Sequence, residues 1–150
     1  MSETQPLKRQ RWKHGLLYCI TLNNGSAVRG KILNDISNVV FDQVFHSPTA
    51  LKEGWKTSSR NPLLYGDLAH FEIKQSFFEV VSHESVTPEE LSVIPPDFRM
   101  LTAHPENCII LYPGTGESRK ALPSECKGLN YAFSWEGPGY VQLIEDKLKG

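Results

Sequence analysis

The segment that most strongly suggests chemistry is CIILYPGTGESRKALPSE, at residues 108–125. Its apolar start predicts a strand, and the glycines and lysine that follow resemble a phosphate-binding loop between a strand and a helix. That loop requires Gly-x-x-x-x-Gly-Lys-Ser/Thr, because the second glycine lets the backbone approach the phosphates and the hydroxyl holds Mg²⁺. Arg119 occupies the position of that glycine, and Ala121 occupies the position of the hydroxyl residue.

A proline gives a third argument against a nucleotide-binding site at residues 114–121. Pro123 would lie inside the helix that must follow such a loop, where proline removes a backbone hydrogen bond and clashes with the preceding turn. We therefore predict that this segment binds no nucleotide. We expect an exposed loop between strands, with Glu117, Arg119 and Lys120 at its tip, better suited to contact with a partner.

The sequence shows no pattern for metal binding or for a serine nucleophile. The histidines are His14, His46, His70, His83 and His104. No two of them have the i,i+2 or i,i+4 spacing that places two imidazoles on one metal, so we predict no metal site and no cofactor. The Gly-x-Ser-x-Gly motif of a nucleophilic serine is also absent from the sequence.

Two weaker catalytic candidates can be weighed against ordinary structural roles. Cys126 precedes Lys127, a cation that can lower the pKa of a thiol, but we expect an uninvolved loop thiol. His70 and Glu72 share one face of an expected strand and could form an acid–base pair. The wet face of any half-exposed strand has the same composition, so we assign no catalytic residue and predict that the protein is not an enzyme.

The overall composition is that of an ordinary globular chain. The 150 residues are 39% hydrophobic and 22% charged, which suffices for one domain with a core. We expect neither a membrane-spanning segment nor a secretory signal, because apolar runs are short and the N-terminus is polar. The three cysteines form no CxxC pair, which indicates reduced thiols and a cytoplasmic protein, with Cys19 and Cys108 as small buried hydrophobes.

Charge is balanced except at the N-terminus. The net charge is −1, from 16 basic and 17 acidic residues, which disfavours a protein devoted to nucleic acid. Residues 8–13 nevertheless place four cations around Trp12, and such a cluster can attract a polyanion. We expect residues 1–14 to form a flexible basic arm whose Trp12 packs on the fold, followed by a single β-rich domain over residues 15–150.

The residue pattern behind the arm predicts mainly strands. The runs at 16–22 and 27–33 flank an Asn-Asn-Gly turn, which favours a hairpin. Gly30 indicates a strong bend or a close approach of another backbone in the second run. Arg29 and Lys31 alternate there with apolar residues and so point to the opposite face. Further strands are expected at residues 39–45, 68–74, 76–82, 108–112 and 129–135.

Helical signals are few. Thr87 as N-cap, a proline in the first turn and Glu90 at the third position form a capping box, which predicts one short helix near residues 88–93. Residues 140–148 fit either a closing strand or a terminal helix, and we favour a strand that frays or turns helical at its end. The sum is a mainly β (β-rich α+β) fold, either a strongly bent antiparallel sheet or a small Sm-like or Src-homology-type barrel.

Residues 46–66 break the strand pattern and are expected to form a long loop. A loop of this length in a small domain is unusual and often carries function. It contains residue types that are enriched at binding hot spots, namely Trp55, Lys56, Arg60 and Tyr65. The alternative is that Trp55 and Tyr65 only cover one end of the fold.

Over residues 8–100 the segments KRQRWKHGLLYCITLNNGSAVRGKIL, VVFDQV, LAHFEIKQSFFEVVS and SVIPPDFRM follow a recurring layout. A basic lead-in with tryptophan precedes a strand that ends in a Gly turn, then a strand with a central glycine and an apolar strand with Phe and Asp. The layout resembles a family of immunity proteins of bacterial polymorphic toxin systems. The matching positions are Trp12, Gly15, Leu22, Gly25, Gly30, Phe41, Asp42, Phe71, Phe78, Pro96 and Phe98. The chain departs from the layout in residues 46–66 and after residue 100.

The resemblance implies a cytoplasmic, non-enzymatic inhibitor that binds a toxin domain as its protein partner. The expected contacts are Trp55, Lys56, Arg60 and Tyr65, together with an acidic patch of Asp42, Glu72 and Glu79. Two alternatives stay open at this point. One is nucleic-acid binding through the basic arm, and the other is a small-ligand or enzyme pocket near His70 and His104, between the first strands and residues 100–150.

Overall fold

The structure is a computed structural model that describes residues 14–34, 37–55, 60–68, 78–100, 107–131, 134–135 and 137–150. In chain order the elements are β1 (Leu16–Thr21), β2 (Ala27–Ile32), β3 (Asn38–Phe41), α1 (Pro48–Glu53), β4 (Pro62–Leu68), β5 (Phe78–His83), α2 (Pro88–Ser92), β6 (Asp97–Met100), β7 (Cys108–Tyr112), β8 (Glu117–Ala121), the 3₁₀-helix η3 (Pro123–Cys126), β9 (Asn130–Tyr131), β10 (Ser134–Trp135) and α3 (Gly137–Lys149).

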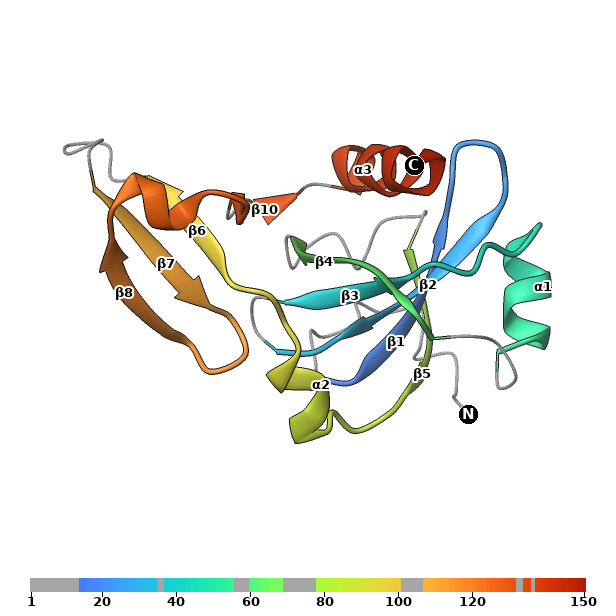
Figure 1. Cartoon of the computed structure of the whole chain (residues 1–150). Coiled ribbons are helices and arrows are strands. Elements are labelled where there is room, and N and C mark those ends of the chain that lie inside the picture. The colour runs from blue at the N-terminus through green and yellow to red at the C-terminus, as the bar shows by residue number, and fades with distance from the viewer. Residues whose placement is uncertain are drawn as a thin grey trace.

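The fold is mainly β with two separate sheets (Figure 1). The main sheet has the order β10-β4-β3-β2-β1-β5 and the small sheet the order β8-β7-β6-β9. All pairings are antiparallel except the two-residue parallel pairings β10–β4 and β6–β9. Among the described residues the end strands β5 and β10 do not pair with each other, so the main sheet is open. The expected antiparallel sheet is therefore confirmed, and the barrel alternative is wrong.

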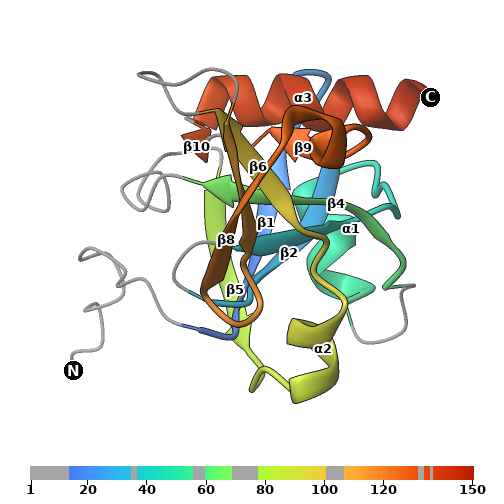
Figure 2. The same cartoon turned by 60° about the vertical axis from the view of Figure 1, so that its left-hand side comes forward.

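One face of the main sheet is covered by α3, as both views show (Figure 1, Figure 2). Strand alternation places Leu16, Tyr18 and Ile20 of β1 on this face, where they pack against Tyr140 and Ile144 of the helix. We had favoured a strand for residues 140–148, and that prediction is wrong. The helix forms because its apolar residues recur at helical spacing and so bury one stripe against the sheet.

A buried hydrogen-bond cluster lies within this apolar layer. The Tyr18 and Tyr140 hydroxyls each donate to Asn38 Oδ1 at 2.6 Å, and Asn38 Nδ2 donates to the Gly66 carbonyl at 2.9 Å. The three side chains are almost fully buried, which is tolerated because their polar groups are paired. The cluster joins β1, β3, β4 and α3 at one point.

Gly30 is the position on β2 that makes room for this cluster. It pairs directly with Tyr18, and a Cβ at Gly30 would overlap the Tyr18 ring. The predicted close approach of another backbone at Gly30 is wrong, because the approaching group is an aromatic side chain. Gly66 leaves room for the Tyr140 ring in the same way, since a Cβ there would lie 2.8 Å from that ring.

The second face of the main sheet is covered by α1 and by the segment that contains α2. Leu51 of α1 packs on Cys19 and Ala27, and Leu91 of α2 packs with Phe41 in a separate apolar cluster. The capping box of α2 is present as predicted, with both the Thr87 and the Glu90 side-chain bonds formed. None of the described helices is long and apolar enough to span a membrane.

The expectation of one long loop over residues 46–66 is wrong. Ser47 caps α1 by accepting from the Ala50 N–H at 3.1 Å, and Pro48 occupies its first turn. The later part of the segment, from residue 62, belongs to β4, which pairs with β3. The Thr-Pro pair at residues 87–88 predicted α2, and the Ser-Pro pair at residues 47–48 is the corresponding sequence signal for α1.

The former phosphate-loop candidate at 114–121 forms a β-hairpin. It leads into the four-residue 3₁₀-helix η3 rather than the long helix that a nucleotide site would require. A turn at residues 113–116 joins β7 to β8, so Glu117, Arg119 and Lys120 lie on a strand rather than at a loop tip. Part of this turn packs against the rest of the protein and cannot contact a partner. Asn34 Nδ2 donates to the Pro113 carbonyl at 2.7 Å, and a Cβ at Gly114 would overlap the Leu91 carbonyl.

We expect Gly30→Ala to destabilise the protein by about 2–4 kcal/mol, because the added methyl displaces the Tyr18 ring and with it a buried hydrogen bond. Urea unfolding measures the loss. The matched test repeats the substitution in a Tyr18→Leu background, where the space is open and the additional loss is expected to fall below about 1 kcal/mol. An equal loss in both backgrounds would show that the ring is not the cause.

Candidate functional site

The most unusual chemistry of the described residues is a pair of buried cations on β2. Arg29 and Lys31 alternate with Val28 and Ile32, and both are 0% exposed. The alternation was predicted, with both cations on the opposite face from Val28 and Ile32, but it did not indicate that they are buried. Burial of an unpaired charge is very costly, so the groups around these two side chains have to supply compensation.

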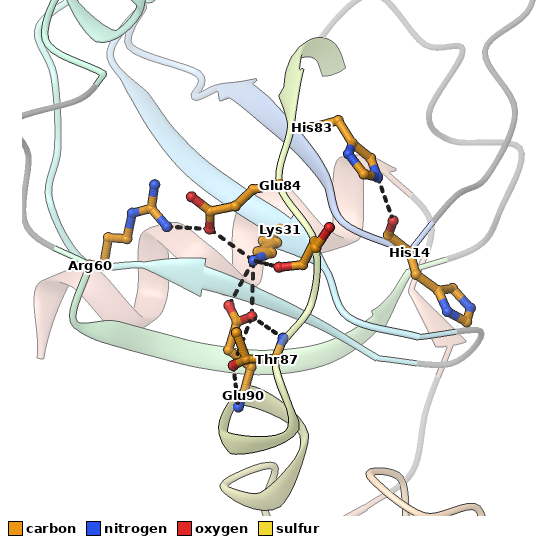
Figure 3. A network of polar contacts seen from close by, with 8 residues as sticks. His14, Lys31, Arg60, His83, Glu84, Thr87 and Glu90 are labelled. Carbon is orange, nitrogen blue, oxygen red and sulfur yellow. Dashed lines mark hydrogen bonds and ion pairs between the residues drawn. The ribbon is translucent and has the colours of Figure 1, made fainter.

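Lys31 is compensated by two carboxylates and a carbonyl (Figure 3). Its Nζ lies 2.9 Å from Glu84 Oε1 and 2.8 Å from Glu90 Oε2, and it donates to the Ser85 carbonyl at 3.2 Å. Glu90 is also the capping-box residue of α2, where its Oε1 accepts from the Thr87 N–H at 2.8 Å. The Glu90 carboxylate thus caps the N-terminus of α2 and also neutralises Lys31 of β2.

Glu84 extends the network to Arg60, whose Nη1 lies 2.6 Å from Glu84 Oε1. The hydrogen bonds from Arg60 and then from Lys31 lower the pKa of Glu84 from 4.5 to about 2. The same contact raises the pKa of Arg60. Glu84 is therefore an anion at neutral pH, and it bridges two cations rather than serving as a proton acceptor.

Arg29 is flanked by two aromatic rings. Its guanidinium carbon lies 5.2 Å from the ring centre of Phe41 and 5.2 Å from that of Trp55, a cation–π geometry. Its Nη1 also donates to the Trp55 carbonyl at 3.2 Å. Burial, and then the nearby Arg60, lower the pKa of Arg29, which nonetheless stays charged as arginines do.

We name Arg29, Lys31, Arg60, Glu84 and Glu90 the cation cluster. It contains three cations and two carboxylates and so carries one excess positive charge. Each carboxylate contacts a cation from another part of the chain, so the cluster links these segments to one another. It links Trp55, Arg60 and the β5–α2 connection to β2, and it orients Trp55 and Arg60 at the edge of solvent.

An open groove lies beside the cluster, between the main sheet and the β7–β8 turn. It has a volume of about 600 Å³ and is lined by His14, Asn34, His83, Leu91 and Gly114, among others. His83 Nε2 lies 3.0 Å from the His14 carbonyl oxygen (Figure 3). The groove falls where a pocket between the first strands and residues 100–150 was considered, but His70 and His104 lie outside the described residues.

The predicted contact residues occupy different surroundings. Trp55 is half-buried and contacts Arg29, and Arg60 is exposed and contacts Glu84. Tyr65 packs against the apolar cluster around Phe41, where burial raises the pKa of its phenol. Lys56 lies outside the described residues.

The expected acidic patch is not a single patch in the described part of the chain. Asp42 is exposed just after β3, and its N–H donates to the Asn61 carbonyl at 2.9 Å. Glu79 lies on β5 and contacts Lys52 of α1 at 2.6 Å. Strands β2 and β1 separate β3 from β5 in the sheet, and Glu72 lies outside the described residues.

Sequence reasoning missed the cation cluster because it treated Lys31 and Glu90 separately. Glu90 was found as a capping residue and Lys31 as one polar residue of a strand. Their partnership joins residues far apart in sequence, and no local pattern encodes it. Among the residues that the structure describes, no group of three or more His, Cys, Asp or Glu could hold a metal ion.

Comparisons of the chain with protein-family models, with curated proteins and with solved structures found no match.

The depressed pKa of Glu84 makes a prediction about pH. A carboxylate with a lowered folded-state pKa stabilises the fold above its unfolded pKa of about 4.5, and the contribution is lost as pH falls toward about 2. We expect Glu84→Gln to lower stability at pH 7 and to flatten the stability profile between these two values. The effect stays modest, since the Glu84 side chain is 43% exposed and screened by solvent.

Urea unfolding between pH 2 and pH 7 measures how stability depends on pH in the natural protein and in Glu84→Gln. Glu117→Gln, which removes an exposed carboxylate of β8, is the matched control and should leave the slope as in the natural protein. An unchanged slope in Glu84→Gln would contradict the assignment of the shift to this residue.

Proposed function

We propose that the protein is a non-enzymatic, cytoplasmic binding module that inhibits a bacterial toxin domain by attaching to it, as an immunity protein does. The proposal rests on the resemblance of residues 8–100 and on one structural observation. Trp55 and Arg60, two predicted contact residues, are both anchored to the main sheet by the cation cluster.

Anchoring matters because binding loses affinity when side chains must be ordered at the interface. The Trp55 ring is fixed against Arg29 and its backbone carbonyl accepts from the same guanidinium. The Arg60 side chain is 39% exposed while Glu84 holds it in position. Both side chains are therefore preorganised, and Trp and Arg are the residue types that most often dominate interface energies.

Charge favours an acidic surface on the partner at this point. The cation cluster has one excess positive charge, and Arg60 is the cation of the cluster that reaches solvent, beside the partly exposed Glu84. A guanidinium has five N–H donors, so Arg60 can bind a carboxylate of the partner while Glu84 keeps its orientation. An electrostatic contact of this kind speeds association and selects the partner.

The other two hypotheses receive less support. Residues 1–13 of the basic arm that would bind nucleic acid lie outside the described residues. His70 and His104 of the suggested pocket also lie outside them. The anchored Trp55–Arg60 pair favours protein binding, because it presents hot-spot side chains rather than an enclosed cavity.

The test is a binding measurement between the purified protein and the product of the neighbouring open reading frame. Trp55→Ala and Arg60→Ala are each expected to weaken the complex about 30-fold or more, the loss typical of a hot spot. Lys127→Ala removes an exposed cation that directly follows η3, and this matched control should bind normally. Circular dichroism verifies that each variant is folded.

Co-expression supplies the functional arm of the same test. The neighbouring product should arrest growth alone and be neutralised by the natural protein but not by Arg60→Ala. A neighbour that is harmless alone and does not bind would overturn the proposal. Full binding by both site variants would instead remove Trp55 and Arg60 from the interface.

A further inference from the structure

Three sulfur atoms meet in the core of the small sheet, whereas the cation cluster is centred on the main sheet. Met100 of β6 and Cys108 of β7 are direct partners in the antiparallel pairing of these strands. Cys108 Sγ lies 3.3 Å from Met100 Sδ. Cys126, on η3, folds back over the sheet into the same apolar cluster as Cys108.

The fold, rather than a sequence motif, creates this arrangement. Strand pairing sets Met100 beside Cys108, and the short connection from β8 into η3 returns Cys126 to them. Both cysteines are free thiols, 0% and 4% exposed. The expectation that Cys126 lies in a loop is wrong, because it belongs to η3 and its thiol is buried in the same apolar cluster as Cys108.

An open groove leads to the three sulfur atoms. It has a volume of about 520 Å³, and Met100, Cys108 and Cys126 all line it. Phe98 and Leu129 supply an apolar wall, and Lys127 supplies a cation. A ligand can thus approach from solvent, which a site buried inside the sheet would not allow.

We propose that Met100, Cys108 and Cys126 form a binding site for a soft monovalent metal ion, Cu(I), held by two thiolates and one thioether. A thioether beside two thiolates favours Cu(I), whereas zinc is bound by Cys, His and carboxylate side chains and its structural sites are closed by four Cys or His ligands. This site is independent of the proposed protein binding, because it uses other residues on the other sheet.

The chemistry of uptake is a proton exchange without a redox step. Each thiol releases its proton to solvent as its sulfur bonds to the metal, and copper stays in the +1 state. Two thiolates and Cu(I) leave one negative charge, which the neighbouring Lys127 offsets.

The geometry requires a small adjustment. Three sulfur ligands about 2.3 Å from one ion lie about 4 Å from one another. The Met100–Cys108 sulfur distance of 3.3 Å must therefore widen, and the three rotatable bonds of methionine permit this at low cost.

The test is a titration of the reduced, full-length protein with Cu(I) without oxygen, in competition with a coloured Cu(I) chelator. We expect the protein to withdraw one equivalent of copper. Loss of a residue that only supports a metal ligand typically lowers metal affinity about 10–100-fold. Cys108→Ala and Cys126→Ala each remove a ligand itself, so each should lower the affinity for Cu(I) about 100-fold or more. Met100→Leu removes only the weaker thioether and should lower it about tenfold.

Cys19→Ala is the matched control, because Cys19 is a third buried thiol that packs with Ala27 and Leu51 instead. It should keep full affinity. No withdrawal of copper by the natural protein, or equal affinity in Cys19→Ala and Cys108→Ala, would overturn the proposal. X-ray absorption of the copper-loaded natural protein needs no variant, and nitrogen or oxygen ligands in its spectrum would also overturn it.

Discussion

The burial of Arg29 and Lys31 is the constraint on which the arrangement around the main sheet depends. A charged group taken out of water costs several kcal/mol unless partners replace its hydration. These two cations lie on the central strand β2, so their partners must be brought over the middle of the sheet. Glu84 and Glu90 satisfy Lys31, and the Trp55 and Phe41 rings hold Arg29.

The cations also explain why two apolar clusters, rather than one, cover the second face of the sheet. One cluster surrounds Leu51 of α1 and the other surrounds Leu91 of α2, and Arg29 contacts a ring from each. On the opposite face the polar centre is Asn38 between two tyrosines. Strand β2 joins the two arrangements. Gly30 makes room for Tyr18 on one face, and its neighbours Arg29 and Lys31 point to the other face.

Local signals in the sequence predicted the elements with strong patterns. The β1–β2 hairpin, the β5 strand and the capped helix α2 all follow from alternation, turn residues and the capping box. Helix α1 was missed because the surrounding loop residues outweighed its Ser-Pro start. Helix α3 was misassigned because Val141 and Leu143 fit a strand as well as a helix.

Contacts between distant residues set the limit of prediction. Closure into a barrel depends on pairing between strands far apart in the chain, and the strand patterns alone do not decide it. Likewise, the residues near Lys31 in the sequence do not predict its ion pairs with Glu84 and Glu90. The residues near Cys126 do not predict that it packs in the same cluster as Met100. The candidate residues Trp55 and Arg60 were found by type, whereas the groups that anchor them appear only in the fold.

The most direct test of the buried-cation constraint is a double-mutant cycle between Lys31 and Glu90. Urea unfolding of the natural protein, Lys31→Met, Glu90→Gln and the double variant gives their coupling free energy. A buried lysine that depends on this carboxylate predicts a coupling of about 1.5 kcal/mol or more. Losses that add to within about 0.5 kcal/mol would contradict the account, since the two residues would then act independently.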